Sequence, residues 1–179
     1  KIGALAGSAS IKHNDGKLDC QKERSARMIH LRLKTEYTFG QTFASIPKMI
    51  ERLKEINCTA AGIVDTNSTW GHVKWFDACK AAGIQPLLGV ELTVTETEDF
   101  LPKMWFLAQN EEGLRETYRL SSRAHSTPVL TRRGSIPRLY PSDVLGISPN
   151  ILVFAGEITD GAFLKAANAI VDLNPSSRV

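Results

Sequence analysis

The sequence has 179 residues, of which 42% are hydrophobic and 23% charged, and its formal net charge is +3. This length fits one domain that can bury its own core, and the composition excludes collagen and low-complexity disorder. No apolar run approaches the roughly 18–20 residues that cross a bilayer, so we expect no membrane association.

The first half of the chain alternates between strands and helices. Residues 1–27 form a polar lead-in with turn residues and irregular apolar spacing. Alternating apolar residues then predict a strand over residues 28–34, and an amphipathic stripe predicts a helix over residues 43–57. A short apolar strand over residues 59–65 and a helix over residues 70–82 follow.

The second half continues this alternation. The predicted elements are strands over residues 85–94, 104–108 and 151–155, and helices over residues 111–124 and 161–171. The segment 126–141 contains three prolines and no clear period, so we expect a loop there.

Strands that are apolar almost throughout and alternate with helices are typical of parallel strands covered by helices. The sequence therefore predicts an α/β sheet or a (β/α) barrel. Functional groups in such folds gather at the carboxyl ends of the strands. The positions to consider are residues 32–37, residues 65–70, Glu91 and residues 155–157.

Positive charge is concentrated in two segments. Residues 1–34 hold eight Lys or Arg and three acidic residues, and residues 121–140 hold four Arg and no acidic residue. Basic segments can follow phosphates, so Arg132, Arg133 and Arg138 are candidate nucleic-acid contacts. A solvated loop surface is the alternative, because no aromatic residues interleave with these arginines.

The cysteines indicate the compartment. Cys20, Cys58 and Cys79 are an odd number of thiols without CxxC spacing, which argues against a disulfide framework and against a structural zinc site. We therefore expect buried or incidental thiols and a reducing, cytoplasmic compartment.

Other histidines and tryptophans have simple interpretations. His72 and His125 lie on predicted helices without an i,i+4 ligand partner, so we expect each at the surface or at a helix cap. We expect Trp70, Trp75 and Trp105 in the core or at an interface.

Six blocks of sequence, in a fixed order, carry a family pattern. They are residues 30–38 (HLRLKTEYT), 63–67 (IVDTN), 71–76 (GHVKWF), 82–91 (AGIQPLLGVE), 107–114 (LAQNEEGL) and 152–157 (LVFAGE). Together they resemble the PHP (polymerase and histidinol phosphatase) domain, and in particular that of bacterial DNA polymerase III alpha subunits.

The resemblance implies a distorted (β/α) TIM-like barrel of the PHP type over residues 28–179. We expect this barrel to be incomplete, because the last motifs of the family would follow Val179. The resemblance also implies a cluster of His, Asp, Glu and Cys ligands at the strand ends. In active members of the family this cluster binds up to three divalent ions and hydrolyses phosphoesters.

This sequence departs from the family pattern at the ligands themselves. Arg32, Lys34, Thr66 and Lys103 stand where the family has histidines, and Glu157 stands where it has a cysteine. Ligand-type residues remain at two family positions, with a histidine at a flanking position: these are Asp65, Glu91 and His30.

The chemistry of these replacements opposes metal binding. Arg has no electron pair to offer, and Lys is a donor at neutral pH, whereas Zn²⁺ and Mn²⁺ need electron-pair donors. We predict that ion pairs between the new cations and the remaining acidic residues replace the metals, and that no residue here is catalytic. If the site is still active with Zn or Mn, Asp65 and Glu91 are the candidate ligands.

The resulting prediction is the N-terminal PHP domain of a replicative polymerase of the DNA polymerase III alpha type, without a cofactor of its own. The parent enzyme would extend DNA with Mg²⁺. Its partners would be the rest of the polymerase chain, replisome proteins and a proofreading exonuclease docked on this scaffold. Two alternatives stay open: a free protein-binding module, and a stand-alone PHP-type phosphoesterase that uses His30, Asp65, Glu91 and Glu157.

Overall fold

The computed structural model describes residues 29–98, 101–132 and 134–156. The predicted lead-in 1–27 and the predicted helix 161–171 lie outside these residues. The elements in chain order are β1 (His30–Leu33), α2 (Ile46–Glu55), β2 (Ala60–Thr66), α3 (His72–Ala81), β3 (Gln85–Val94), β4 (Lys103–Ala108), α4 (Glu111–Ser126), β5 (Val129–Thr131), β6 (Gly134–Ile136), β7 (Arg138–Leu139), α5 (Pro141–Val144) and β8 (Ile151–Ala155).

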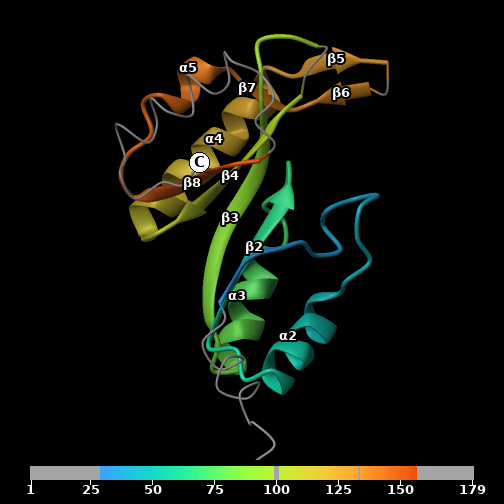
Figure 1. Ribbon diagram of the computed structural model, residues 1–179, viewed down its shortest axis with the longest axis vertical. Helices are drawn as coiled ribbons and strands as arrows, with labels where there is room; N and C mark the ends of the chain where they lie inside the picture. The colour runs from blue at the N-terminus through green and yellow to red at the C-terminus, as the bar shows by residue number, and fades with distance from the viewer. Residues whose placement is uncertain (1–28, 99–100, 133, 157–179) are drawn as a thin grey trace, which may run out of the picture.

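A six-stranded mixed sheet organises the described chain (Figure 1). Its strand order is β1-β2-β3-β4-β8, and β7 pairs with the end of β3. The strands β1, β2 and β3 are parallel, whereas β4 runs antiparallel to both β3 and β8. The sheet is strongly curved, so that it forms part of a barrel wall (Figure 1).

The α/β class and the incomplete, TIM-like barrel are confirmed, but the prediction of parallel strands throughout is wrong at β4, which runs antiparallel to both of its neighbours. Only eight residues separate Val94 at the end of β3 from Lys103 at the start of β4. A parallel crossover needs a dozen or more residues, so β4 returns as an antiparallel neighbour and pairs Lys103 with Thr93.

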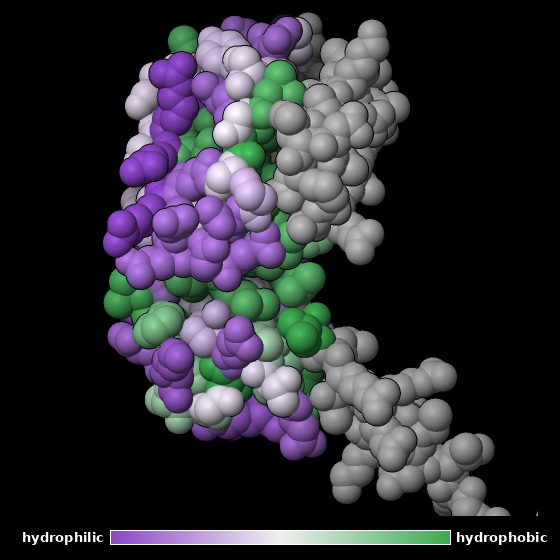
Figure 2. Space-filling model, turned by 90° about the vertical axis from the view of Figure 1, so that its left-hand side faces the viewer, coloured by the Kyte–Doolittle hydropathy of each residue, from purple (hydrophilic) through white to green (hydrophobic). Residues whose placement is uncertain are grey.

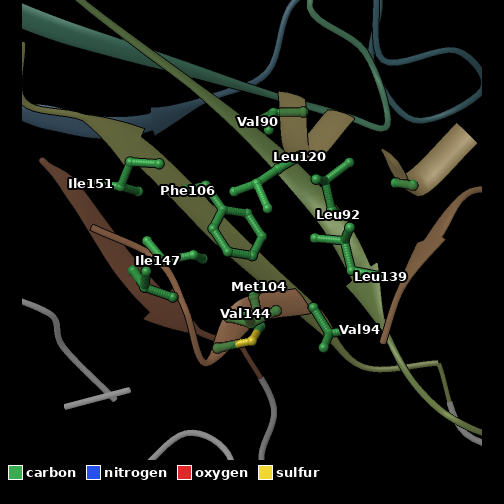
Figure 3. Close-up of a cluster of buried hydrophobic side chains, with 12 residues drawn as sticks. Val90, Leu92, Val94, Met104, Phe106, Leu120, Leu139, Val144, Ile147 and Ile151 are labelled. Carbon is green, nitrogen blue, oxygen red and sulfur yellow. The ribbon is translucent and has the colours of Figure 1, made fainter. Parts of the chain in front are cut away.

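Two groups of helices close two hydrophobic cores. The helices α2 and α3 lie together and bury Trp75 and Ile63 against β1 and β2 (Figure 1). The helices α4 and α5 close the second core on β3, β4 and β8. Figure 3 shows Phe106 of this core surrounded by aliphatic side chains such as Leu120 and Ile151. Full burial of one such side chain contributes about 1.5–3 kcal/mol.

A proline and a glycine suit the positions that they occupy around α2 and α3. Pro47 lies in the first turn of α2, where its fixed φ suits the helix and its missing N–H costs nothing. Gly83 has a φ of +72° directly after α3, a conformation that favours glycine. This turn lets the chain enter β3 beside β2, with Gln85 opposite Ala60.

The segment 126–141 is not the predicted loop. The strands β5 and β6 form an antiparallel hairpin that pairs Val129 with Ile136. Gly134, with a φ of +117°, is the first residue of β6 and pairs with Thr131. The strand β7 then adds Leu139 to the main sheet opposite Val94. Strands of two or three residues are too short to show a period, so the sequence pattern missed them.

The tryptophans differ in their exposure. Trp75 is a core residue as predicted, whereas Trp70 is 70% exposed and meets Phe39 edge to face, with ring centroids 5.8 Å apart, so an interface position for Trp70 stays a prediction. Hydrophilic side chains cover much of the face shown in Figure 2, with smaller hydrophobic areas between them. Among the described residues, no helix is both long and apolar enough to span a membrane.

Two of the three cysteines are buried as predicted. Cys58 and Cys79 lie in the core beside α2 and α3, and among the described residues neither forms a disulfide. Burial, with a smaller effect of the nearby Cys58, raises the pKa of Cys79 to about 11. The Cys79 thiol is therefore protonated at neutral pH. Cys20 lies outside the described residues.

Candidate functional site

Glu91 is the centre of the candidate site. It lies on β3 where that strand runs beside the end of β2, with Thr66 opposite it on β2 and Trp105 opposite it on β4. Its side chain is fully buried. A buried carboxylate must be paired, because an isolated charge in the interior is very costly.

Three cations converge on Glu91. The Arg32 guanidinium donates to Oε2 at 2.7 Å, and the Lys34 ammonium donates to Oε1 at 2.8 Å. The Lys103 ammonium forms a longer ion pair with Oε1, at 3.4 Å. Arg32 and Lys34 come from β1 and its end, and Lys103 comes from the start of β4, so the sheet order brings them together. The predicted pairing of these cations with Glu91 is confirmed.

Hydrogen bonds complete the environment of Glu91. The Thr66 hydroxyl donates to Oε1 at 2.9 Å, and the Lys34 ammonium donates to the Thr66 hydroxyl at 2.9 Å and to Gln41 Oε1 at 3.0 Å. Burial alone raises the pKa of Glu91, but the hydrogen bonds from Lys34, Arg32 and Thr66 outweigh burial and lower this pKa to about 2. Glu91 is therefore ionised at neutral pH.

Trp105 positions the Arg32 guanidinium from the neighbouring strand. The guanidinium carbon lies 3.8 Å from the centre of the Trp105 ring, which is the distance of a cation–π contact. Phe154 of β8 packs on Trp105 with ring centroids 6.0 Å apart. The sequence reasoning missed this role, because the β4 and β8 register that places the rings here depends on the antiparallel return.

Asp65 belongs to a separate cluster. It is fully buried, and both of its carboxylate oxygens accept hydrogen bonds from the segment after β1. Oδ1 accepts from the Thr35 N–H at 2.7 Å and from the Thr38 hydroxyl at 2.6 Å, and Oδ2 accepts from the Thr35 hydroxyl at 2.7 Å. The expected pairing of Asp65 with a cation is therefore not found in the described part of the chain.

The described residues do not fit a metal ion. Both oxygens of Glu91 already accept from cations, and both oxygens of Asp65 already accept from threonine donors. The side chains around Glu91 are Arg, Lys and Thr, which offer a cation almost no electron pairs. Within residues 29–98, 101–132 and 134–156, no three His, Cys, Asp or Glu side chains are grouped to hold a metal.

The other predicted site residues lie apart from this cluster or outside the described residues. His30 is half-buried on β1. Glu157 and Arg133 lie outside the described residues. Arg132 is exposed beside the β5–β6 turn. Arg138 donates to the backbone carbonyl of Thr127 and to the Tyr140 hydroxyl, so its guanidinium holds the segment between α4 and α5.

The prediction that His72 lies at the surface or at a cap is wrong. It is buried in the first turn of α3, where its ring nitrogens lie 2.9 Å from the Gly89 carbonyl and 3.2 Å from the Tyr118 hydroxyl. Burial is the main cause that lowers the pKa of His72. The missing signal was that α3 packs its first turn onto β3, which no spacing in the sequence indicates.

A family model described as the PHP domain matches residues 30–159. The DNA polymerase III subunit alpha of Halalkalibacterium halodurans is 29% identical over 94 residues, which cover 52% of this chain and 8% of that protein. The DNA polymerase III subunit alpha of Staphylococcus aureus is 27% identical over 122 residues, which cover 68% of this chain and 11% of that protein. This chain thus matches about a tenth of the length of these curated relatives.

Among solved structures, an amidohydrolase from Chromobacterium violaceum is similar with a TM-score of 0.43 and 17% sequence identity, over 55% of this chain and 33% of that chain.

Proposed function

The chain belongs to the PHP domain family, and we propose that it is the metal-free PHP domain of a replicative DNA polymerase of the polymerase III alpha type. The relatives that carry the name DNA polymerase III subunit alpha support the polymerase context. In that context the parent protein extends DNA with Mg²⁺ in the bacterial or host cytoplasm, and this domain contacts the rest of the polymerase chain.

One observation carries the proposed loss of metal chemistry. Arg32, Lys34 and Lys103 all pair with the buried carboxylate of Glu91. The sequence resemblance aligns these positions with the metal ligands of the family. In the proposed domain, fixed side-chain cations therefore occupy the place of the catalytic cations. Such cations stabilise the strand ends electrostatically, but they cannot activate water for hydrolysis as a metal does.

The role that remains is structural. The ion-pair cluster links side chains of β1, β3 and β4 and so adds to the backbone pairing of the sheet. A scaffold of this kind can hold the polymerase core and dock a separate proofreading exonuclease. Since the domain would have no nuclease site of its own, proofreading would depend on that partner.

The stand-alone phosphoesterase is less well supported. It needs His30, Asp65, Glu91 and Glu157 as ligands, yet the two described carboxylates already have full sets of donors. His30 lies on β1, and no hydrogen bond or ion pair between described residues joins it to Glu91.

The test is a nuclease and phosphoesterase assay on the full-length protein. A 3′-labelled single-stranded oligonucleotide and a chromogenic phosphoester are incubated with added Mn²⁺. The proposal expects no hydrolysis above the level of a Glu91→Ala variant, while a pull-down recovers a proofreading exonuclease. Mn²⁺-dependent hydrolysis that disappears in Glu91→Ala but persists in the surface variant Glu55→Ala would support the phosphoesterase instead.

A further inference from the structure

A pocket opens beside the ion-pair cluster. Its volume is about 560 Å³, and Arg32, Lys103 and Trp105 form its wall together with the chain at residues 101–102 and 155–156. Two of the three cations that pair with Glu91 therefore face this space. The lining residues come from β1, from the start of β4 and the two residues before it, and from the end of β8.

The charges around this pocket do not balance among the described residues. Arg32, Lys34 and Lys103 share one carboxylate, that of Glu91. Asp65 does not offset them, because threonine donors occupy its oxygens. The Glu91 side chain is fully buried, whereas the side chains of Arg32 and Lys103 are 43% and 37% exposed. The excess positive charge is therefore presented toward the pocket.

The donors on this wall are available and oriented. Arg32 reaches Glu91 through Nη2, and within the described residues its other N–H groups donate no hydrogen bond. Stacking on Trp105 at 3.8 Å fixes the plane of the guanidinium. The Lys103 ammonium has three donors, and its 3.4 Å pair with Glu91 is longer than the pairs of Arg32 and Lys34. A stacked Arg fork beside a partly exposed Lys ammonium is suited to a phosphate group.

We propose that this pocket binds a phosphate group through Arg32 and Lys103, without hydrolysing it. Phosphate fits better than a lone carboxylate, because its second negative charge matches the excess of two cations over Glu91. The volume exceeds that of a single phosphate, so the group is carried by a larger molecule, either a DNA strand or a small phosphorylated ligand. The inference rests on the metal-free site of the proposed function, because Arg32 and Lys103 replace the ions that would otherwise hold the anion.

The test uses inorganic phosphate as the probe, titrated calorimetrically into the full-length protein in phosphate-free buffer at constant ionic strength. We expect saturable binding, weakened about tenfold or more in Lys103→Gln because a charge-assisted hydrogen bond is lost. Lys54→Gln removes the same charge from the exposed face of α2 and should change the affinity less than about twofold. Lys103→Gln should still fold, since its ion pair is the longest of the three.

Each result has a defined meaning. Equal binding in wild type, Lys103→Gln and Lys54→Gln, or no saturable binding in wild type, would overturn the phosphate pocket and leave the proposed metal-free scaffold standing. Binding that disappears after treatment with a chelator would assign the phosphate to a bound metal and would overturn both. If a single-stranded oligothymidylate competes with phosphate, the source is DNA. If it does not compete, the source is a small phosphorylated ligand.

Discussion

The Glu91→Gln variant removes the one negative charge at the centre of the cation cluster while keeping the size of the side chain. Arg32, Lys34 and Lys103 then face each other across a neutral amide, which keeps only one of the two oxygens that accept from Arg32 and Lys34. Removal of one partner from a buried ion pair is costly because the remaining charges stay unpaired.

The size of the effect follows from the pKa of Glu91. Its lowering from 4.5 to about 2 corresponds to roughly 3 kcal/mol in favour of the ionised carboxylate. Broken buried pairs cost about 3–5 kcal/mol. Arg32 and Lys103 are partly exposed, so water screens part of the repulsion. We therefore expect Glu91→Gln to lower the free energy of unfolding by about 2–3 kcal/mol at neutral pH.

The pH dependence gives this prediction a distinctive sign. The folded-state pKa of Glu91 lies below the ordinary value of 4.5, so its stabilisation is present above that value and is lost as the pH falls through about 2. The difference between wild type and Glu91→Gln should therefore shrink between about pH 5 and pH 2. A merely steric effect of the amide would not shrink in this way.

Urea unfolding followed by tryptophan fluorescence and circular dichroism measures both effects. The matched control is Glu55→Gln, which removes the partner of Arg52 in an exposed pair on α2 and should cost less than about 1 kcal/mol. If Glu91→Gln is as stable as wild type at neutral pH, or if its deficit does not change between pH 5 and 2, Glu91 does not hold the cluster together as described.

Three further changes test other parts of the structure. Asp65→Asn should lower the free energy of unfolding by about 1–3 kcal/mol, because the new amide nitrogen cannot accept the hydrogen bonds that a carboxylate oxygen accepts. A urea titration with the midpoint of wild type would contradict a stabilising role of these hydrogen bonds. Burial lowers the pKa of His72, so the stabilisation that depends on its neutral ring is present above the ordinary pKa of 6.5 and is lost as the pH falls. His72→Gln removes this titration and should make the melting temperature fall less between about pH 7 and 5 than in wild type. A fall of the same size in both proteins would refute this. Gly113→Ala would place a Cβ against the Asn150 carbonyl oxygen and should lower the free energy of unfolding by about 1–3 kcal/mol, despite the gain in helix propensity. Gly146→Ala is the control, because its Cβ would enter open space. Equal melting temperatures for the two variants would show that the close approach of Gly113 to Asn150 does not limit the packing of α4.

Elements with long apolar runs could be predicted from the sequence. The strands β3 and β8 have the predicted bounds, 85–94 and 151–155, because each is a mostly apolar run that polar residues or glycine follow. The helix predicted over residues 43–57 is shorter, at Ile46–Glu55, because its first residues precede the Ser45 N-cap. Strand direction is decided by connection length and packing, so the antiparallel placement of β4 was not visible in the hydrophobic pattern.

The candidate site could be predicted in part. The opposite charges of Arg32, Lys34 and Glu91 made their pairing predictable once the strand ends were aligned. Asp65 has the same charge as Glu91, yet it accepts hydrogen bonds from Thr35 and Thr38, because the turn after β1 closes on it before any cation reaches it. Threonine hydroxyls are uncharged, so the sequence does not indicate which acceptor they bind. Their partners depend on the geometry of the turn.

The metal content of the purified full-length protein tests the central claim most directly. The protein is incubated with Zn²⁺ and Mn²⁺, desalted, and analysed by mass spectrometry for metal per chain, with a Glu91→Ala variant beside it. Because Arg32 and Lys34 donate to the two oxygens of Glu91, we predict no stoichiometric metal at this site. Wild type and Glu91→Ala should therefore hold the same amount of metal per chain, which is any ion bound elsewhere in the parent chain. Two or more tightly bound ions per chain that disappear in Glu91→Ala would contradict the replacement of metal ions by side-chain cations.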